Sequence, residues 1–228
     1  MSLLLHVEPH WVSPYVFAVF VTLREKALAF DSAALDHRQG ETRGARYLNK
    51  TITGRVPTLI HGELGLGEST AIIEYLEETF PERRVLPGSA VDRARCRQLM
   101  SWLRSDETLA LRAERSTHTI FYDRNTTPLT DAALSSAKKL VEVAGCVIRA
   151  GQPHLFAEWS IADSELALAL HRLTVNGDPV PSGIKEWAEA QWERPSVRAF
   201  VEIGRPNLRD GAAPATATSS PPALPSGR

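Results

Sequence analysis

Short apolar runs alternate with segments of helical periodicity along the first eighty residues. Runs of about five residues between polar or turn-forming positions predict strands, and apolar residues three to four apart predict helices. The expected elements are a strand at 3–7, a helix at 14–28, a strand at 29–35, a short helix within 36–53, a strand at 56–60, a hairpin turn at 62–67 and a helix at 69–80. This order, β-α-β-α-β-β-α, predicts a small mixed sheet with helices packed on it.

Residues 81–90 interrupt this pattern with two prolines, a glycine and several charges, and predict a linker between domains. The region 91–205 that follows is nearly all helical in its periodicity and predicts an all-α second domain. Its expected helices are 92–117, 132–149, 161–175, 184–191 and 196–203. Ser160 and Asp163 form a predicted capping box at the start of the third of these helices.

The end of the chain has a different composition. Residues 211–227 are nearly all alanine, proline, serine, threonine and glycine, with Leu224 as their one large apolar side chain. Such a segment buries too little apolar surface to offset the entropy of ordering it. Residues 206–228 are therefore expected to form a disordered tail.

Charge and cysteine content exclude several classes of protein. Among the 228 residues, 26 are basic and 27 acidic, which gives a net charge of −1 and no excess to neutralise a nucleic-acid backbone. The two cysteines, Cys96 and Cys146, are too few for a disulfide framework or a multi-cysteine metal site. His118, His154 and His171 lack the spacing of metal ligands, so no metal is expected.

Apolar runs and the N-terminus bear on location. No apolar run reaches the roughly 18–20 residues that cross a membrane. Residues 1–8 lack the basic and long apolar regions of a secretory signal. We therefore expect a cytoplasmic protein without a membrane partner.

Ser13, Pro14 and Tyr15 lie where the first strand gives way to the first helix. Proline is favoured in a first helical turn, and serine before it is a good N-cap, so Ser13 can simply cap the helix. Alternatively, its hydroxyl lies where helix N–H groups favour negative charge, and it can donate a hydrogen bond to a ligand thiolate.

Two further segments of this half carry polar or backbone groups suited to a ligand. Arg55-Val56-Pro57 leads a strand, and its proline marks either an edge strand or a cis turn with the Val56 backbone facing outward. Glu68 and Ser69 begin a helix, where they either cap it or hold the carboxylate and ammonium of a head group.

Taken in order, Ser-Pro-Tyr, Arg-Val-Pro-Thr-Leu and Glu-Ser-Thr-Ala-Ile-Ile-Glu-Tyr-Leu resemble segments of the soluble glutathione transferases, and Gly151–Asp163 resembles the segment leading into a buried helix of their second domain. The resemblance covers about residues 1–205. It implies a thioredoxin-like N-terminal domain, an all-α C-terminal domain, glutathione as co-substrate and a homodimer.

Carried over by position, the resemblance assigns Ser13 to the glutathione thiol and the Val56 backbone to the cysteinyl unit. It assigns Glu68 and Ser69 to the γ-glutamyl head and Arg55 to the vicinity of the glycine carboxylate. Residues 10–13 contain no cysteine, and the first strand carries His6 rather than tyrosine. The resemblance therefore implies a bacterial serine-type member.

A small electrophile is expected between the domains. The candidates for its walls are Tyr15, Trp102, Arg104, Arg112 and Arg115. For the arginines, the alternative is a solvated helix face with Asp106, Glu107 and Glu114 as partners.

The resemblance implies an enzyme that ionises the glutathione thiol for attack on this electrophile. Glutathione-dependent reduction of peroxides or disulfides is an alternative, although no Cys-x-x-Cys is present. Two others are an isomerase or dehalogenase that uses glutathione as a cofactor, and a non-catalytic module that keeps the fold for protein association.

Overall fold

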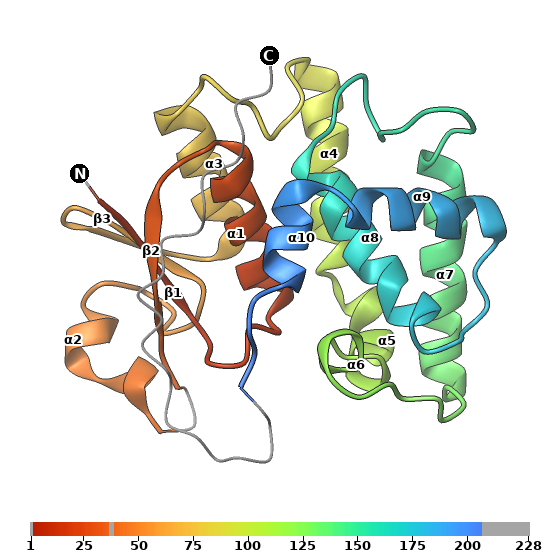
Figure 1. Cartoon of the computed structure of the whole chain (residues 1–228), viewed down its shortest axis with the longest axis horizontal. Helices are drawn as coiled ribbons and strands as arrows, with labels where there is room; N and C mark the ends of the chain where they lie inside the picture. Colours follow the sequence, from red (N-terminus) through yellow and green to blue (C-terminus); the bar gives the residue numbers. More distant parts are fainter. Residues whose placement is uncertain (1, 37–38, 207–228) are drawn as a thin grey trace. The chain divides into compact units, whose positions relative to one another are not determined.

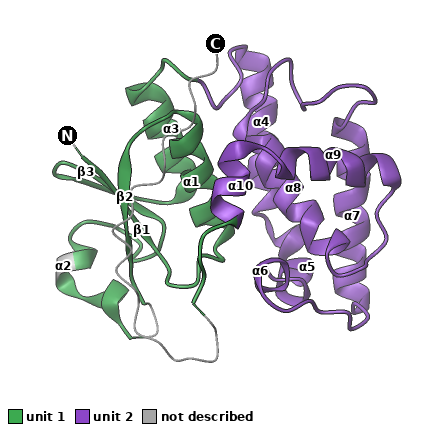
Figure 2. Cartoon of the chain, viewed as in Figure 1, with its two compact units in different colours: residues 1–83, 202–228 green, residues 84–201 purple. Residues whose placement is uncertain are grey.

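The computed structural model describes residues 2–36 and 39–206, so nearly all of the predicted tail, residues 207–228, lies outside the described residues. The chain forms two compact units (Figure 2). Unit 1 comprises residues 1–83 and the segment that begins at Glu202, and unit 2 comprises residues 84–201. The division at 83/84 falls inside the predicted linker, whereas residues 202–205, expected in the helical domain, join unit 1.

Unit 1 is built on a four-stranded sheet in the order β2-β1-β3-β4 (Figure 1). The strands are β1 (Leu3–Val7), β2 (Phe30–Ala34), β3 (Thr58–His61) and β4 (Leu64–Gly67). β1 and β2 are parallel and are joined through α1 (Pro14–Glu25), while β3 pairs antiparallel with both β1 and β4. A two-residue turn suffices for the β3–β4 hairpin, whereas the parallel pair needs a helical crossover.

Helices cover both faces of this sheet. Alternate residues of β1, namely Leu3, Leu5 and Val7, are at most 3% exposed. In Figure 1, α1 and α3 (Ser69–Thr79) lie on one side of the sheet and α2 (Ala45–Leu48) on the other. His6 points to the α2 side, where its ring contacts Tyr47 edge-on at 5.6 Å. This arrangement confirms the predicted thioredoxin-like domain.

Unit 2 is helical throughout its regular structure. Its helices are α4 (Ala90–Leu103), α5 (Leu109–Glu114), α6 (His118–Phe121), α7 (Asp131–Val147), α8 (Ile161–Thr174), α9 (Ser182–Trp192) and α10 (Pro195–Val201). α8 is the central helix: it contacts α4, α6, α7 and α9, and every residue from Ile161 to Leu168 is buried. The buried polar residues of such a helix need partners, and here Asp163 accepts from Ser160 and Glu165 accepts from Arg104.

The predicted capping box begins α8. Both Asp163 oxygens accept hydrogen bonds: Oδ2 from the N–H and Oγ of Ser160, each at 2.9 Å, and Oδ1 from the N–H of Leu155 at 2.8 Å. Burial raises the pKa of the Asp163 carboxyl, while these donors act in the opposite direction. The backbone N–H of Ile161 donates to Val85 and joins the helix start to the first residues of unit 2.

The predicted helix 92–117 is wrong as one element. α4 ends at Leu103, a 3-10 turn covers Asp106–Thr108, and α5 follows. The Ser105 hydroxyl donates to the Trp102 carbonyl at 2.7 Å, and the Thr108 hydroxyl donates to that of Leu103 at 3.0 Å. Serine and threonine hydroxyls thus take up the carbonyls of the last turn and end the helix.

None of the described helices has the length and apolar character needed to cross a membrane.

Candidate functional site

Strand register brings the three predicted ligand-binding segments to one edge of the sheet. Thr58, the first residue of β3, pairs with His6 near the end of β1 and with Gly67 at the end of β4. Adjacent strands lie about 4.8 Å apart. The loop after β1, the residues before β3 and the residues after β4 therefore share this edge, and they hold Ser13, Arg55–Val56 and Glu68–Ser69, respectively.

Ser13 is the N-cap of α1. Its Oγ accepts a hydrogen bond from the Val16 N–H at 3.3 Å, and Pro14 occupies the first helical turn. This cap uses Oγ as an acceptor and leaves the hydroxyl hydrogen for a different bond. The capping and thiolate-donor interpretations of Ser13 are therefore compatible, because one hydroxyl can perform both roles.

Glu8, which the sequence interpretation missed, organises the loop that ends at Ser13. Its Oε1 accepts the N–H of Ser13 at 2.7 Å and also that of Val12. Burial raises the pKa of the Glu8 carboxyl, and the two N–H donors and the positive charge of Arg205 act in the opposite direction. The available signal was an acidic residue directly after a strand and five positions before the helix cap.

The residues before β3 are fixed through the Arg55 carbonyl. The Thr58 hydroxyl donates to this carbonyl at 2.8 Å, and the Tyr47 hydroxyl lies 3.0 Å from it and 2.8 Å from Thr58 Oγ1. The Val56–Pro57 bond is cis, one of the two alternatives read from the sequence. The Arg55 side chain is exposed and Val56 is half-buried. Tyr47 and Thr58 are supporting residues that the sequence interpretation missed.

Glu68 and Ser69 occupy the start of α3. Glu68 precedes the helix with a left-handed φ of 64°, and its side chain is exposed and makes no capping bond. Ser69 is the first helical residue and is 5% exposed. Non-glycine residues in left-handed conformations are uncommon and cluster at ligand sites. The exposed carboxylate is thus held at the same sheet edge as Ser13.

The burial of Arg115 contradicts its predicted place in the wall of the electrophile pocket. The residue is 1% exposed, its Nε donates to Asp178 Oδ2 at 2.6 Å, and its Nη2 donates to Asp178 Oδ1 at 2.9 Å. Nη2 also reaches the Thr127 carbonyl at 2.8 Å. Arg115 therefore joins segments inside unit 2 and presents no surface to a small molecule.

Arg104 and Arg112 also face protein groups. Arg104 forms a two-point ion pair with Glu165 of α8 and donates to the Met100 carbonyl at 2.8 Å. Arg112 donates to the carbonyls of Arg104 and Ser105. The ion-pair partners of Arg104 and Arg115 come from distant segments of the chain. This differs from the expected solvated helix face, in which Asp106, Glu107 and Glu114 were the partners.

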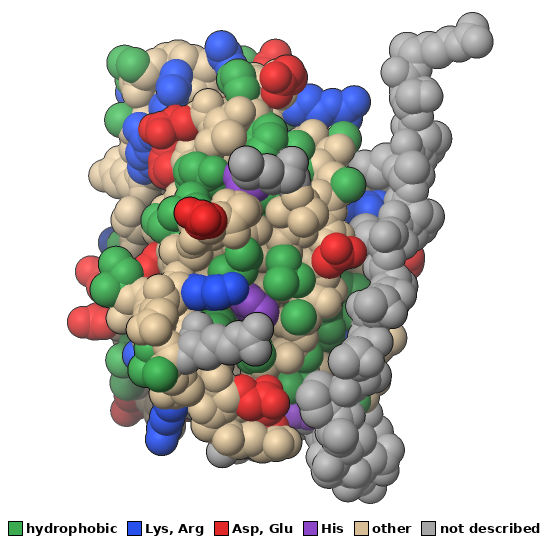
Figure 3. All heavy atoms as spheres, turned by 90° about the vertical axis from the view of Figure 1, so that its left-hand side faces the viewer, with side chains coloured by type: hydrophobic (Ala, Val, Ile, Leu, Met, Phe, Trp, Pro, Cys, Tyr) green, Lys and Arg blue, Asp and Glu red, His purple; other side chains and the backbone are tan. Residues whose placement is uncertain are grey.

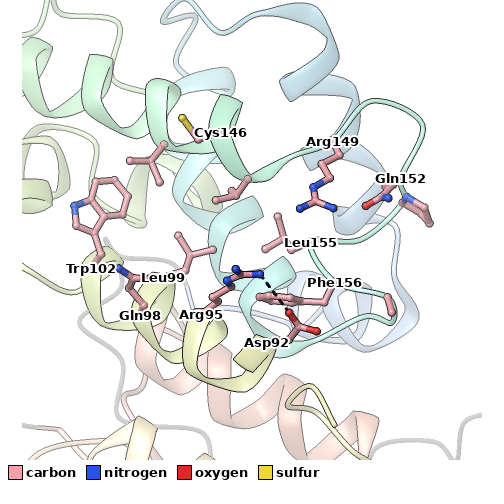
Figure 4. A pocket seen from close by; sticks show the side chains of 14 residues that line it. Asp92, Arg95, Gln98, Leu99, Trp102, Cys146, Arg149, Gln152, Leu155 and Phe156 are labelled. Carbon is pink, nitrogen blue, oxygen red and sulfur yellow. Dashed lines mark ion pairs between the residues drawn. The ribbon is translucent and has the colours of Figure 1, made fainter. Parts of the chain in front are cut away.

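The two aromatic candidates lie in different units. Tyr15 is half-buried in the first turn of α1 in unit 1. Trp102 belongs to α4 in unit 2, donates from Nε1 to Glu107 at 2.9 Å and lines a cavity of about 920 Å³ (Figure 4). Trp102 is the only predicted wall residue that lines this cavity.

The cavity in unit 2 has walls from α4, from the end of α7 and from residues 149–157 (Figure 4). The lining combines apolar side chains, among them Leu99 and Phe156, with the guanidinium groups of Arg95 and Arg149. Arg95 Nη1 lies 3.7 Å from Oδ1 of Asp92, which belongs to the same helix, α4. Cys146 of α7, which is exposed, is also among the residues that line this cavity.

Neither the charge on the face drawn in Figure 3 nor the grouping of potential metal ligands among the described residues indicates a further binding site. On the face shown in Figure 3, acidic and basic side chains are interspersed among apolar and neutral groups. Within residues 2–36 and 39–206, no three His, Cys, Asp or Glu side chains are grouped so that they could hold a metal ion.

Two family models match the chain. Residues 11–84 match the N-terminal domain of glutathione S-transferases, and residues 90–205 match their C-terminal domain. The crystal structure of a glutathione transferase homolog from Burkholderia, with bound glutathione, is 36% identical, with a TM-score of 0.73. The similarity covers 88% of this chain and 97% of that one.

Named relatives give a similar result. A probable maleylacetoacetate isomerase of Vibrio cholerae is 37% identical over 101 residues, which are 43% of this chain and 46% of the relative. This match thus spans less than half of that protein. Glutathione S-transferase Z2 of Arabidopsis thaliana is 25% identical over 215 residues, which are 89% of this chain and 93% of the relative. The two matched domains, together with the sheet and the helical unit, show that the chain belongs to the glutathione S-transferase family.

Proposed function

We propose that this protein is a glutathione transferase of the serine type, in which the Ser13 hydroxyl stabilises the glutathione thiolate. The observation that carries the proposal is the meeting of three segments at one sheet edge through the register of Thr58. Ser13 caps α1 at this edge, and because its Oγ acts as the acceptor for the Val16 N–H, its hydroxyl hydrogen is left for a bond to a ligand. The family membership supplies glutathione as the ligand.

The tripeptide is held by groups from these segments. The Val56 backbone pairs with the cysteinyl unit as an added strand does. Glu68 accepts from the ammonium of the γ-glutamyl head, and Ser69 and the start of α3 hold its carboxylate. Arg55, exposed beside Val56, lies on the side of the glycine carboxylate.

Ser13 acts by favouring the ionised form of the bound thiol. A thiol with a pKa of about 8.5 is only a few per cent ionised at neutral pH, and each unit of lowering corresponds to about 1.4 kcal/mol. A hydroxyl hydrogen bond and the N-terminus of α1 together lower it by about one to two units. The thiolate attacks the electrophilic carbon, a carbon–sulfur bond forms and the leaving group departs with its electron pair.

A second candidate reaction is glutathione-dependent isomerisation. It is favoured by the match to the probable maleylacetoacetate isomerase, which covers part of both chains. Here the thiolate adds to a conjugated double bond, rotation follows about the resulting single bond, and the thiolate is expelled. Glutathione is then regenerated, whereas conjugation consumes it.

We also propose, on the family resemblance, a homodimer in the cytoplasm.

The test measures glutathione binding and the pH dependence of conjugation in the wild type and in Ser13→Ala. We expect retention on immobilised glutathione, turnover of a chromogenic aryl halide, and a higher apparent pKa for kcat/KM in Ser13→Ala. Ser89→Ala is the matched control, because Ser89 caps α4 in the same way, at 3.4 Å from the Asp92 N–H, but lies in unit 2.

An unchanged pH–rate profile in Ser13→Ala contradicts the role of this hydroxyl. Glutathione retention without turnover of any electrophile or peroxide contradicts catalysis and favours a non-catalytic module. Substrate isomerised without loss of glutathione selects the second reaction.

A further inference from the structure

The loop between β1 and α1 has a backbone that needs support. Trp11, two residues before Ser13, has a φ of 51°, in the left-handed region that bulky side chains rarely adopt. The Trp11 N–H reaches back to the Glu8 carbonyl at 3.3 Å. Such conformations persist where surrounding contacts determine them.

Glu8 supplies contacts on the N–H side of this loop. Its Oε1 accepts from both Val12 and Ser13, so one oxygen fixes two consecutive peptide groups. Its Oε2 is shielded from solvent and has no hydrogen-bond partner within the described residues. A carboxylate oxygen shielded in this way lowers stability. The position of Glu8 is therefore explained better by the loop that it organises than by a gain in stability from the carboxylate itself.

Arg205 supplies a contact on the carbonyl side. Its Nε donates to the Trp11 carbonyl at 3.2 Å, and its Nη1 donates to the Ile203 carbonyl at 3.2 Å. Its positive charge also acts on the Glu8 carboxyl. Arg205 follows α10 and belongs to the part of the chain that joins unit 1 after the helical unit. A residue 194 positions away thus binds the loop that carries Ser13.

We propose that Glu8 and Arg205 are positioning residues for Ser13. Glu8 fixes the peptide groups on the amino side of Ser13, Arg205 fixes the carbonyl of Trp11, and together they set the direction of the Ser13 hydroxyl. This inference rests on the proposed role of Ser13. It adds that the ionisation of bound glutathione depends on two side chains that do not touch the tripeptide.

The experiment compares Glu8→Ala, Glu8→Gln, Arg205→Met and Ser13→Ala. The readouts are the ultraviolet absorbance of the bound thiolate against pH, kcat and the KM for glutathione. We expect Glu8→Ala and Arg205→Met to raise the pKa of the bound thiol and to lower kcat/KM by about ten- to a hundredfold, since small misplacements of reacting groups have effects of this size. Glu8→Gln keeps an oxygen for both N–H groups and is expected to stay close to the wild type.

Coupling to Ser13 separates positioning from general loss of structure. In the Ser13→Ala background, Glu8→Ala is expected to produce almost no further shift of the thiol pKa, because the hydroxyl that it positions is gone. Glu63→Ala is the control, since Glu63 is exposed in the β3–β4 turn. If Glu8→Ala does not fold, Arg205→Met and Glu8→Gln carry the test.

The outcomes distinguish this inference from the proposed function. A shifted thiol pKa in Ser13→Ala, with none in Glu8→Ala or Arg205→Met, overturns the inference and leaves the function of Ser13 in place. An unshifted pKa in Ser13→Ala contradicts the proposed function itself. Equal shifts in Glu8→Gln and Glu8→Ala also overturn the inference, because the amide oxygen then fails to replace the carboxylate.

Discussion

Arg115 and Asp178 form a two-point ion pair, with Nε 2.6 Å from Oδ2 and Nη2 2.9 Å from Oδ1. The Arg172 guanidinium donates to the Arg115 carbonyl at 2.7 Å, which joins the end of α5 to α8. The fork of arginine matches a carboxylate in this geometry. The arginine expected to face an electrophile is thus part of the interior of unit 2.

Arg115→Met is expected to lower the free energy of unfolding by about 3–5 kcal/mol, because it leaves Asp178 without its cation. Denaturant unfolding measures this loss. Retention on immobilised glutathione should persist below the unfolding transition, since the segments proposed to bind glutathione lie in unit 1. Selective loss of activity in a fully stable Arg115→Met protein would instead restore Arg115 to the pocket.

Asp163→Asn is expected to lower the free energy of unfolding by about 2–4 kcal/mol. Both oxygens of Asp163 accept hydrogen bonds, so the amide nitrogen of asparagine must face an N–H or O–H donor. Asp131→Asn, in the exposed first turn of α7, is the control and should change stability much less. Equal effects of the two substitutions would contradict the role given to the capping box.

Tyr47→Phe is expected to raise the KM for glutathione severalfold with little change in kcat. The substitution removes a hydroxyl that supports Thr58 and the Arg55 carbonyl beside Val56. Loss of one such hydrogen bond lowers stability by about 1 kcal/mol. Tyr122→Phe, at the end of α6 in unit 2, is the control. A Tyr47→Phe protein with unchanged KM shows that the Arg55–Val56 backbone does not depend on this contact.

The two cysteines are expected to differ in reactivity. Cys146 is exposed, whereas Cys96 is fully buried and its pKa is raised to about 12 by burial. A thiol reacts through its thiolate. Alkylation of the folded protein followed by mass spectrometry should therefore modify Cys146, and Cys146→Ser should abolish this labelling. Modification of Cys96 before unfolding would contradict its burial.

His171 is expected to make stability fall at acid pH. Its ring stacks on Trp192 at 4.0 Å, its Nδ1 lies 2.9 Å from the Ala167 carbonyl, and burial lowers its pKa from 6.5. The unfolded chain then binds the proton more readily than the folded one. The contribution of neutral His171 to stability is fully present above about pH 6.5, which is the pKa of the unfolded state. It is lost as the pH falls from there through the lower pKa of the folded state.

His171→Phe keeps an aromatic ring against Trp192 and removes the titrating group. Between pH 7 and pH 5, its free energy of unfolding should therefore decrease less than that of the wild type. The readout is denaturant unfolding across this range. Parallel curves for the two proteins would show that His171 does not contribute to the slope.

The sequence predicts the order of strands and helices along the chain of unit 1 and most helices of unit 2, because apolar periodicity reflects burial directly. It places Ser13, Val56 and Ser69 at element boundaries, where local turn chemistry is informative. It misplaces the end of α4, because the hydroxyl bonds of Ser105 and Thr108 compete with a helical pattern that continues in the sequence.

Supporting contacts between distant residues could not be predicted in the same way. Glu165 and Asp178 come from segments about sixty positions away from Arg104 and Arg115, and periodicity does not identify such pairs. Glu8 is close to Ser13 in the sequence, but its role depends on the left-handed conformation of Trp11, which the residue types in this loop do not predict. The candidate ligand groups are thus visible in the sequence, whereas the residues that hold them in place are not.

The composition of unit 1 from two separate stretches of chain has a consequence for biosynthesis. Residues 1–83 leave the ribosome before the helical unit is complete, and the sheet with α1 and α3 can form then. The hydrogen bond from Arg205 to Trp11 forms only after translation has passed α10. A nascent chain, or a protein cut after Val201, therefore lacks the hydrogen bond that Arg205 donates to the loop before Ser13.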